Sequence, residues 1–248
     1  MLDVTMTACR RPDILNKTLS SFGRLITNQW KDCRLIINVD PVGGPENLNP
    51  LILSVCKLHF KDVLINFPDT PNFSRAFKWN WLMCESEYVL NLEDDWEAMR
   101  TIDLNSIIKI LKDEKDLALI RLPMFSSGQD GQKNWTTVYP WNGRYFECPI
   151  EKRDDMGFCG HPSIIKGSYI KSIAPYINEA KNPEKQFHSR GRHIMMQEVR
   201  KWRYGVWGPQ NTPPAIRDIG RKWLINTNWR KKGTKAFFTV WEEISNEA

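Results

Sequence analysis

Residues 89–98, VLNLEDDWEA, are the stretch from which the fold of this 248-residue chain can best be predicted. Val89, Leu90 and Leu92 are typical of a buried strand, and three adjacent carboxylates follow at positions 93–95, where that strand ends. Neighbouring carboxylates repel one another, and burying one without a partner costs free energy. We therefore expect a positively charged group close to this turn.

Strand and helix patterns alternate on both sides of this stretch. Strands are expected at residues 4–8, 34–39, 63–67, 88–92 and 117–122, and helices at residues 12–25, 48–59, 73–85 and 104–111. Such alternation predicts an α/β fold with a mostly parallel sheet flanked by helices. Ligands of these sheets bind beyond the carboxyl ends of the strands. Asp40 and the acidic turn, formed by Glu93, Asp94 and Asp95, are therefore expected to share one cleft.

The composition is that of an ordinary globular protein, with 41% hydrophobic and 26% charged residues. No apolar run is long enough for a transmembrane segment, and the first residues do not resemble a signal peptide. Six cysteines are scattered without CxxC spacing, which disfavours a zinc site and favours a reducing compartment. We therefore expect a cytoplasmic protein, in a bacterium or in a virus-infected host cell.

The second half of the chain is irregular and basic. Long loops with few regular elements are expected from about residue 123 onward. Residues 181–235 contain 14 Lys or Arg against three acids, so this segment carries +11 and the remainder −5 of the total of +6. With its tryptophans, it suggests a polyanionic partner such as nucleotide phosphates, nucleic acid or a lipid surface. The alternative is a solvated basic face with structural tryptophans.

The acidic turn has two interpretations. Mg²⁺ and Mn²⁺ take oxygen ligands and often share them with the phosphates of a substrate. A metal bound to a diphosphate also stabilises it as a leaving group. The turn therefore suggests chemistry on a nucleotide diphosphate, and the alternative is a solvated turn that caps the next helix.

Three segments carry a resemblance to a known family. They are VTMTACRRPDILNKTLSSF at residues 4–22, NFSRAFKWNWLMCESEYVLNLEDDW at residues 72–96 and GHPSIIKGSYI at residues 160–170. Their order and spacing resemble the GT-A fold glycosyltransferases, a family with a DXD metal motif. The first matches a T-x-x-x-R-P-x-x-L-x-x-T-L-x-S pattern, and EDD stands where DXD normally stands. Trp79 and Trp81 depart from the family, in which small residues are usual at these helix positions.

The resemblance implies one GT-A domain over residues 1–248. Residues 1–125 would bind the nucleotide sugar, most simply a UDP-sugar, and residues 126–248 would form the acceptor half with its basic C-terminal segment. The implied donor-binding residues are Thr7, Arg11, Asp40, Asn72, Arg75, Glu93 and Asp94. Asp95 would bind Mn²⁺ or Mg²⁺, with Asp218 or His193 as a further ligand from the C-terminal region.

The implied reaction is displacement at the anomeric carbon by a hexosyl or pentosyl transferase. An inverting enzyme needs a general base near the acceptor hydroxyl. Glu198 fits the place of that base in the family, and Asp154 and Asp155 are alternatives. Glu198 is equally well placed for an intrahelical ion pair with Lys201. The residues expected to contact the acceptor or the phosphates are His161, Arg217, Arg221 and Lys222.

The sequence leaves alternatives open for the acceptor and for the reaction class. The basic, aromatic C-terminal segment suits a hydroxymethylated base in DNA, and glycan and lipid acceptors are alternatives. A nucleotidyltransferase would be expected to carry a Gly-rich phosphate loop after the first strand, where this chain has TACRRPD. A non-catalytic nucleic-acid-binding module would leave the acidic turn unexplained.

Overall fold

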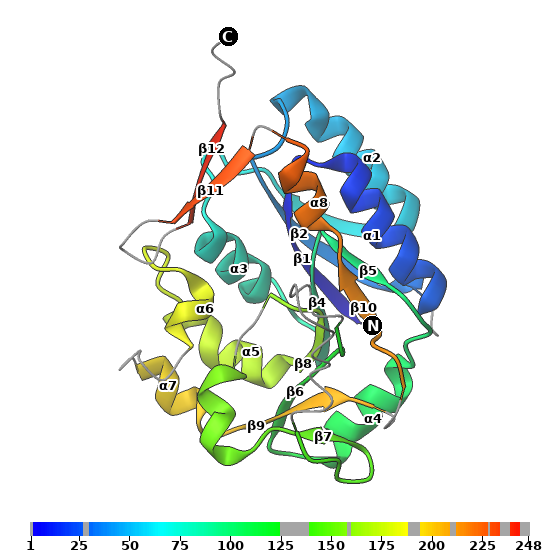
Figure 1. Ribbon diagram of the computed structural model, residues 1–248, viewed down its shortest axis with the longest axis vertical. Helices are drawn as coiled ribbons and strands as arrows, with labels where there is room; N and C mark the ends of the chain where they lie inside the picture. The colour runs from blue at the N-terminus through cyan, green and yellow to red at the C-terminus, as the bar shows by residue number, and fades with distance from the viewer. Residues whose placement is uncertain are drawn as a thin grey trace.

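The computed structural model describes residues 2–26, 30–124, 139–157, 160–187, 194–208, 212–227, 229–233 and 239–243. Its centre is an eight-stranded sheet in the order β3-β2-β1-β4-β8-β6-β9-β7 (Figure 1). The strands are β1 (Asp3–Cys9), β2 (Arg34–Asp40), β3 (Asp62–Asn66), β4 (Tyr88–Glu93), β6 (Leu117–Arg121), β7 (Tyr145–Glu147), β8 (Ser163–Lys166) and β9 (Arg203–Trp207). β8 is antiparallel to β4 and β6, and β7 is antiparallel to β9. The other neighbouring pairs are parallel, so the predicted α/β fold with a mostly parallel sheet is confirmed.

Helices cover both faces of the sheet (Figure 1). Residues of α1 (Pro12–Leu25), α2 (Asn49–His59) and α4 (Leu104–Asp113) belong to the hydrophobic cluster on one face. Residues of α3 (Phe73–Leu82), α5 (Gly167–Ile173) and α7 (Ile194–Val199) belong to the cluster on the other face. A small helix, α6 (Pro183–Gln186), follows α5. The molecule therefore has three layers, with the sheet in the middle.

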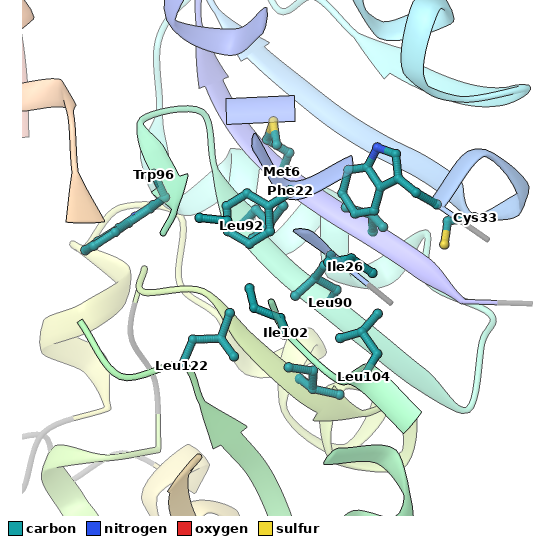
Figure 2. Close-up of a cluster of buried hydrophobic side chains, with 14 of the residues drawn as sticks. Met6, Phe22, Ile26, Cys33, Leu90, Leu92, Trp96, Ile102, Leu104 and Leu122 are labelled. Atoms are coloured by element: carbon teal, nitrogen blue, oxygen red, sulfur yellow. The ribbon is translucent and has the colours of Figure 1, made fainter. Parts of the chain in front are cut away.

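Helix α1 shows how the local sequence specifies the hydrophobic cluster that α1, α2 and α4 form on one face of the sheet. Pro12 stands in the first turn, where its missing N–H costs nothing, and Leu15, Leu19 and Phe22 recur on one side and are fully buried. Phe22 lies in one cluster with Met6 of β1, as Figure 2 shows. The alternation of β1 directs its apolar side chains at even positions toward this helix, so the two elements bury each other.

Helix α3 ends three residues earlier than the sequence pattern predicts. The pattern extends to residue 85, but the last helical residue is Leu82. The Asp3 carboxylate accepts hydrogen bonds from the backbone N–H groups of Glu85, at 2.8 Å, and Ser86, at 2.9 Å. These N–H groups therefore bond to the beginning of β1 and not to the helix.

The second half is more regular than expected. It adds β7, β8 and β9 to the central sheet, and β8 lies between β4 and β6 although it follows both in sequence. β5 (Trp96–Ala98) follows the acidic turn and pairs with β10 (Ile216–Asp218). Helix α8 (Gly220–Ile225) comes next, and β11 (Trp229–Gly233) pairs with β12 (Thr239–Glu243). The C-terminal segment is thereby fastened to the acidic turn.

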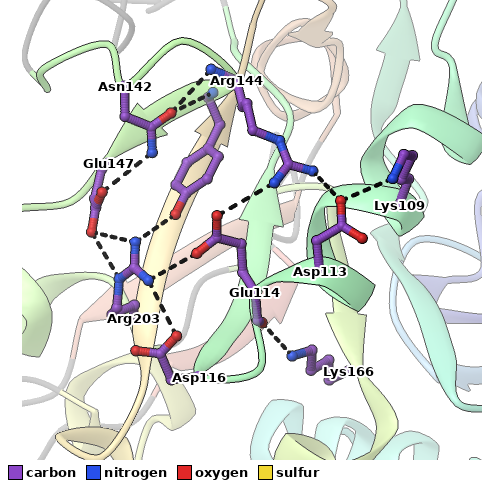
Figure 3. Close-up of polar contacts among 10 residues, drawn as sticks. Lys109, Asp113, Glu114, Asp116, Asn142, Arg144, Glu147, Lys166 and Arg203 are labelled. Carbon is purple, nitrogen blue, oxygen red and sulfur yellow. Dashed lines mark hydrogen bonds and ion pairs between the residues drawn. The ribbon is translucent and has the colours of Figure 1, made fainter.

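An ion-pair network ties the amino ends of β6 and β9 together (Figure 3). Arg203 of β9 donates to Glu114 at 3.0 Å, to Asp116 at 3.1 Å and to Glu147 at 2.8 Å. Arg144 pairs with the same Glu114 at 3.4 Å. Part of the positive charge of the second half is therefore neutralised inside the fold, at the edge of the sheet opposite to the acidic turn.

Within the described residues, the structure contains no helix with both the length and the apolar character needed to cross a bilayer.

Phe22→Ala is expected to lower the free energy of unfolding by about 3–5 kcal/mol, because a buried aromatic ring is replaced by a cavity. Chemical denaturation measures the change. Leu51→Ala, at a side chain of α2 that is 49% exposed, is the matched control and should change stability by less than about 0.5 kcal/mol. Equal effects of the two substitutions would contradict the placement of Phe22 in the core.

Candidate functional site

A cavity of about 220 Å³ opens at the carboxyl ends of β1, β2 and β4. β1 contributes Thr7 and Cys9, β2 contributes Asp40, and the acidic turn contributes all three of its residues. The expected meeting of Asp40 with the acidic turn in one cleft is therefore confirmed. β1 is the centre of this arrangement, since it pairs with β2 on one side and with β4 on the other.

Arg11 supplies the positive charge that the acidic turn requires. Its Nε donates to Asp94 at 3.1 Å, its Nη2 pairs with the other oxygen of Asp94, and Nη2 also lies 3.2 Å from Asp95. The side chains of Arg11 and Asp94 are only 5% and 3% exposed. Burial alone would lower the pKa of Arg11, but the neighbouring carboxylates outweigh it and raise that pKa. The pair is thus a fixed, bidentate ion pair.

Asp94 is held by backbone groups as well. The N–H of Cys9 donates to its carboxylate at 3.0 Å, and its own N–H donates to the carbonyl of Thr7 at 3.1 Å. The Thr18 hydroxyl donates to its carbonyl at 2.5 Å. Both carboxylate oxygens of Asp94 are therefore used inside the protein, although Asp94 borders the cavity and was expected to contact the donor.

Helix α8 covers the other side of Arg11. The Arg11 guanidinium carbon lies 4.8 Å from the centroid of the Trp223 ring, which is a cation–π distance. Leu224 of the same helix borders the cavity, as does Trp241 of β12. The C-terminal segment therefore forms part of the wall of the site.

Glu93 and Asp95 differ from Asp94 in their surroundings. The Trp96 indole N–H lies 3.4 Å from Glu93, and the Asp95 side chain is 24% exposed. A β-carbon at Gly160 would overlap the Glu93 carboxylate, and one at Gly220 would overlap that of Asp95. Glycine at these two positions lets the loop before β8 and the start of α8 close around the acidic turn.

The carboxylates fit a metal that is shared with a substrate. Among the described residues, no three His, Cys, Asp or Glu side chains gather closely enough to hold a metal by themselves. Mg²⁺ is usually bound by one or two carboxylates together with waters and substrate phosphates. Glu93 and Asp95 supply such oxygens at the cavity. The donor set therefore suits a metal bound together with a diphosphate.

Asp218 and His193 were the expected further ligands. Asp218 borders a neighbouring cavity of about 350 Å³ and accepts a hydrogen bond from the Gly220 N–H at 2.8 Å. It is adjacent to the acidic turn, since it pairs with Trp96 across the β5–β10 ladder, but it does not line the same cavity in the described structure. His193 lies outside the described residues.

Asp40 is a buried carboxylate at the end of β2. It accepts hydrogen bonds from the Asn38 side chain at 2.9 Å and from the Asn72 N–H at 3.1 Å. Burial raises the pKa of Asp40 to about 6. The two hydrogen bonds lower this pKa, but they oppose the effect of burial only in part. Asp40 is therefore mostly ionised at pH 7 and becomes protonated within the mildly acidic range.

Asn72 and Arg75, expected at the donor, stand beside the cavity. Phe73 and Ala76 of α3 border it instead. The Asn72 side chain accepts the Arg75 N–H at 2.9 Å and so caps α3. Arg75 donates to the hydroxyl of Thr70 at 3.0 Å. The structure therefore gives the side chains of both residues contacts within the protein, outside the lining of the cavity.

The expected acceptor residues lie around the acidic turn. His161 packs edge-on against Trp96 at 5.2 Å, and burial lowers the pKa of this imidazole to about 3, so it is neutral at pH 7. Arg217 pairs with Glu97 at 2.6 Å, and Arg221 lies 3.5 Å from Asp218. The Lys222 side chain lies outside the described part.

The structure does not bring Glu198 to the cavity. Glu198 is on α7 and pairs with Lys201 at 2.6 Å, which is the intrahelical alternative. Asp154 pairs with Arg200 at 2.7 Å, and the Asp155 side chain is not among those described. Instead, Asn182 and Glu184 line the cavity from the second half. No local pattern in the sequence marks these two positions, because the folding of the second half brings them there.

Arg11→Met is expected to lower the free energy of unfolding by about 3–5 kcal/mol, because it leaves Asp94 buried without its partner. Urea denaturation measures the change. Arg10→Met is the matched control and should cost about 1 kcal/mol, because within the described part of the chain the Arg10 side chain donates one hydrogen bond, to Asn49 at 3.1 Å. A loss from Arg11→Met no larger than that of the control would show that the pair does not hold the turn.

Comparison with known proteins gives structural matches alone: no protein-family model and no curated protein sequence matches the chain. TarS from S. aureus, residues 1–349 in complex with UDP, has a TM-score of 0.58 and 11% identity, over 87% of this chain and 59% of that chain. The same protein in complex with UDP-GlcNAc also gives 0.58 and 11%, over 87% and 57%.

A third solved structure has the same similarity. The mannosyltransferase PcManGT from Pyrobaculum calidifontis, in complex with GDP-Man and Mn²⁺, has a TM-score of 0.59 and 8% identity, over 88% of this chain and 56% of that chain. The chain therefore spans less than two thirds of the length of these proteins. The likeness shows that it has the GT-A fold, as the sequence predicts.

Proposed function

We propose that this protein is a metal-dependent glycosyltransferase that moves a sugar from a nucleotide sugar to a hydroxyl group. The observation that carries the proposal is the cavity at the strand ends, where Arg11 neutralises Asp94 while Glu93 and Asp95 remain beside it. Two solved structures with the same fold contain UDP-GlcNAc or GDP-Man with Mn²⁺. Those ligands belong to those proteins, and they suggest the ligand class here.

Charge is the reason that a metal is part of the proposal. Among the described residues that line the cavity, five are acidic and Arg11 alone is basic. Arg11 is already engaged by Asp94 and Asp95. A diphosphate would therefore be repelled unless a cation accompanied it. Asp95, together with Glu93, would hold Mn²⁺ or Mg²⁺, which when bound neutralises the charge that develops on the leaving diphosphate.

The nucleoside would lie toward β1 and β2. Asp40 presents a carboxylate that can accept a hydrogen bond from a ribose hydroxyl or from a base N–H. Thr7 borders the cavity beside it, and its buried hydroxyl has no hydrogen-bond partner among the described residues. The nucleoside end and the acidic turn would then be joined by the diphosphate.

The candidate acceptors are a glycan, a lipid and a hydroxymethylated base in DNA. The DNA alternative rests on the basic C-terminal segment. Four of its arginines, Arg200, Arg203, Arg217 and Arg221, form ion pairs with acidic side chains of the protein. These pairs reduce the positive charge available to a polyanion and weaken that alternative.

Donor turnover tests the proposal. The protein is incubated with Mn²⁺ and a panel of nucleotide sugars, with and without hydroxymethylated DNA, and free nucleoside diphosphate is measured. Release from one donor would support the transferase and give the sugar, and stimulation by the modified DNA would give the acceptor. Release of pyrophosphate or nucleoside monophosphate would favour a nucleotidyltransferase. Stabilisation by duplex DNA alone, without metal or turnover, would favour a binding module.

Asp95→Asn is expected to abolish the rise in melting temperature produced by Mn²⁺ with UDP-GlcNAc, and to abolish turnover. In the wild type, a donor at about 100 times its Kd should add about 2.7 kcal/mol of stability. The variant without ligands should melt within a few degrees of the wild type, because Asp95 is partly exposed. Asp69→Asn, at an exposed aspartate, is the control. Full metal-dependent stabilisation of Asp95→Asn would remove Asp95 from the site.

Donor affinity is expected to fall about tenfold between pH 7 and pH 5, because the carboxylate of Asp40, with a pKa of about 6, loses its charge and an acceptor over this range. A nucleotide sugar such as UDP-GlcNAc is the suitable probe, since its diphosphate does not titrate there. Isothermal titration calorimetry measures the Kd. Asp40→Asn should bind weakly at both pH values, and an unchanged pH dependence in this variant would exclude Asp40 as its origin.

A further inference from the structure

Four of the five carboxylates that line the cavity have partners within the protein. Asp94 and Asp95 are paired with Arg11. Asp40 accepts two hydrogen bonds, as described above, and Glu93 accepts the indole N–H of Trp96 at 3.4 Å. These contacts hold the four side chains in place within the protein.

Glu184 is the exception. It lies on α6 and enters the cavity from the second half of the chain. The other four carboxylates come from the first half. Among the described residues, no hydrogen bond and no ion pair involves its carboxylate. Its two oxygens are therefore available to a ligand in the cavity.

The segment that carries Glu184 is firmly held. The Gln186 side chain is buried, donates to the carbonyl groups of Asn178 at 2.9 Å and Lys181 at 3.0 Å, and accepts the Asn178 N–H at 2.8 Å. Phe187 is fully buried, and its ring packs edge-on against Trp81 at 6.3 Å. A short helix with such anchors holds its side chains at defined positions.

Helix α3 positions this segment relative to the nucleotide half. The Asn72 side chain donates to the carbonyl of Glu179 at 3.1 Å, and the Ser74 hydroxyl donates to that of Lys181. The N–H of the same Asn72 donates to Asp40. The position of Glu184 is therefore set against the ends of the strands that would bind the donor.

We propose that Glu184 is the general base of the reaction, an inference that rests on the proposed function. Its carboxylate would take the proton of the acceptor hydroxyl as the hydroxyl oxygen attacks the anomeric carbon. The new bond joins that oxygen to the anomeric carbon. The bond from the anomeric carbon to the phosphate oxygen breaks, and its electron pair leaves with the nucleoside diphosphate. Attack opposite to the leaving group inverts the configuration of the sugar.

This assignment replaces Glu198, whose carboxylate is paired with Lys201 and lies away from the cavity. Both residues are glutamates of short helices in the second half, so the local sequence does not distinguish them. The cavity and the absence of a partner among the described residues distinguish Glu184.

Glu184→Gln keeps the shape of the side chain and removes its basicity. Turnover of the donor with water as acceptor should fall by about 10²- to 10⁴-fold. The Kd for the donor with Mn²⁺ should stay within about threefold, which also shows that the variant is folded. Glu184→Asp should keep part of the activity.

Two further variants complete the test. Glu179→Gln is the matched control in the same segment, because Glu179 is paired with Lys78 at 3.2 Å and does not border the cavity. Glu198→Gln examines the alternative base. Both should keep turnover near that of the wild type.

Turnover of Glu184→Gln within tenfold of the wild type, or loss of turnover in Glu198→Gln alone, would overturn the role of Glu184 while the transferase function stood. Transfer with retention of configuration would overturn it as well. If the wild type bound and turned over none of the nucleotide sugars, the proposed function itself would fail, and the role of Glu184 with it.

Discussion

The buried ion pair between Arg11 and Asp94 is the interaction on which the site depends. It joins the loop after β1 to the end of β4, two segments more than 80 positions apart in sequence. A buried charge is tolerated only when it is paired and hydrogen-bonded, and here Arg11 and the Cys9 N–H together occupy the Asp94 carboxylate. Once the pair forms, Trp223 can stack on Arg11, and α8 is thereby placed over the loop.

The order of strands explains the charge of the cavity. Because β1 lies between β2 and β4, the carboxyl ends of all three strands meet at one edge of the sheet, where β2 ends at Asp40 and β4 ends at Glu93. A single arginine cannot neutralise so many carboxylates. The same topology that collects them therefore makes the site suited to a cation, and makes it unsuited to a phosphate ligand that arrives without one.

The local sequence predicts the helices and strands of the first half of the chain well, and those of the second half much less well. Helix α1 has the predicted bounds, residues 12–25, because its apolar period and its early proline act within the helix itself. β8 and β9 are only four and five residues long, so their patterns are short, and pairing with distant strands decides their structure. For the same reason, the local sequence points to Glu198, whereas the structure places Glu184 at the cavity. The place of a carboxylate in the second half depends on anchors such as Gln186, which local periodicity does not reveal.

Asn72 shows how the two halves become one site. Its backbone N–H bonds to Asp40, its side-chain oxygen caps α3, and its side-chain nitrogen bonds to the carbonyl of Glu179. Three polar groups of one residue thus fix the end of β2, the start of a helix and the segment that leads to Glu184. Asp40 and the segment that carries Glu184 therefore share one rigid frame. A displacement reaction needs such a frame, because it requires donor, acceptor and base to be aligned at the same moment.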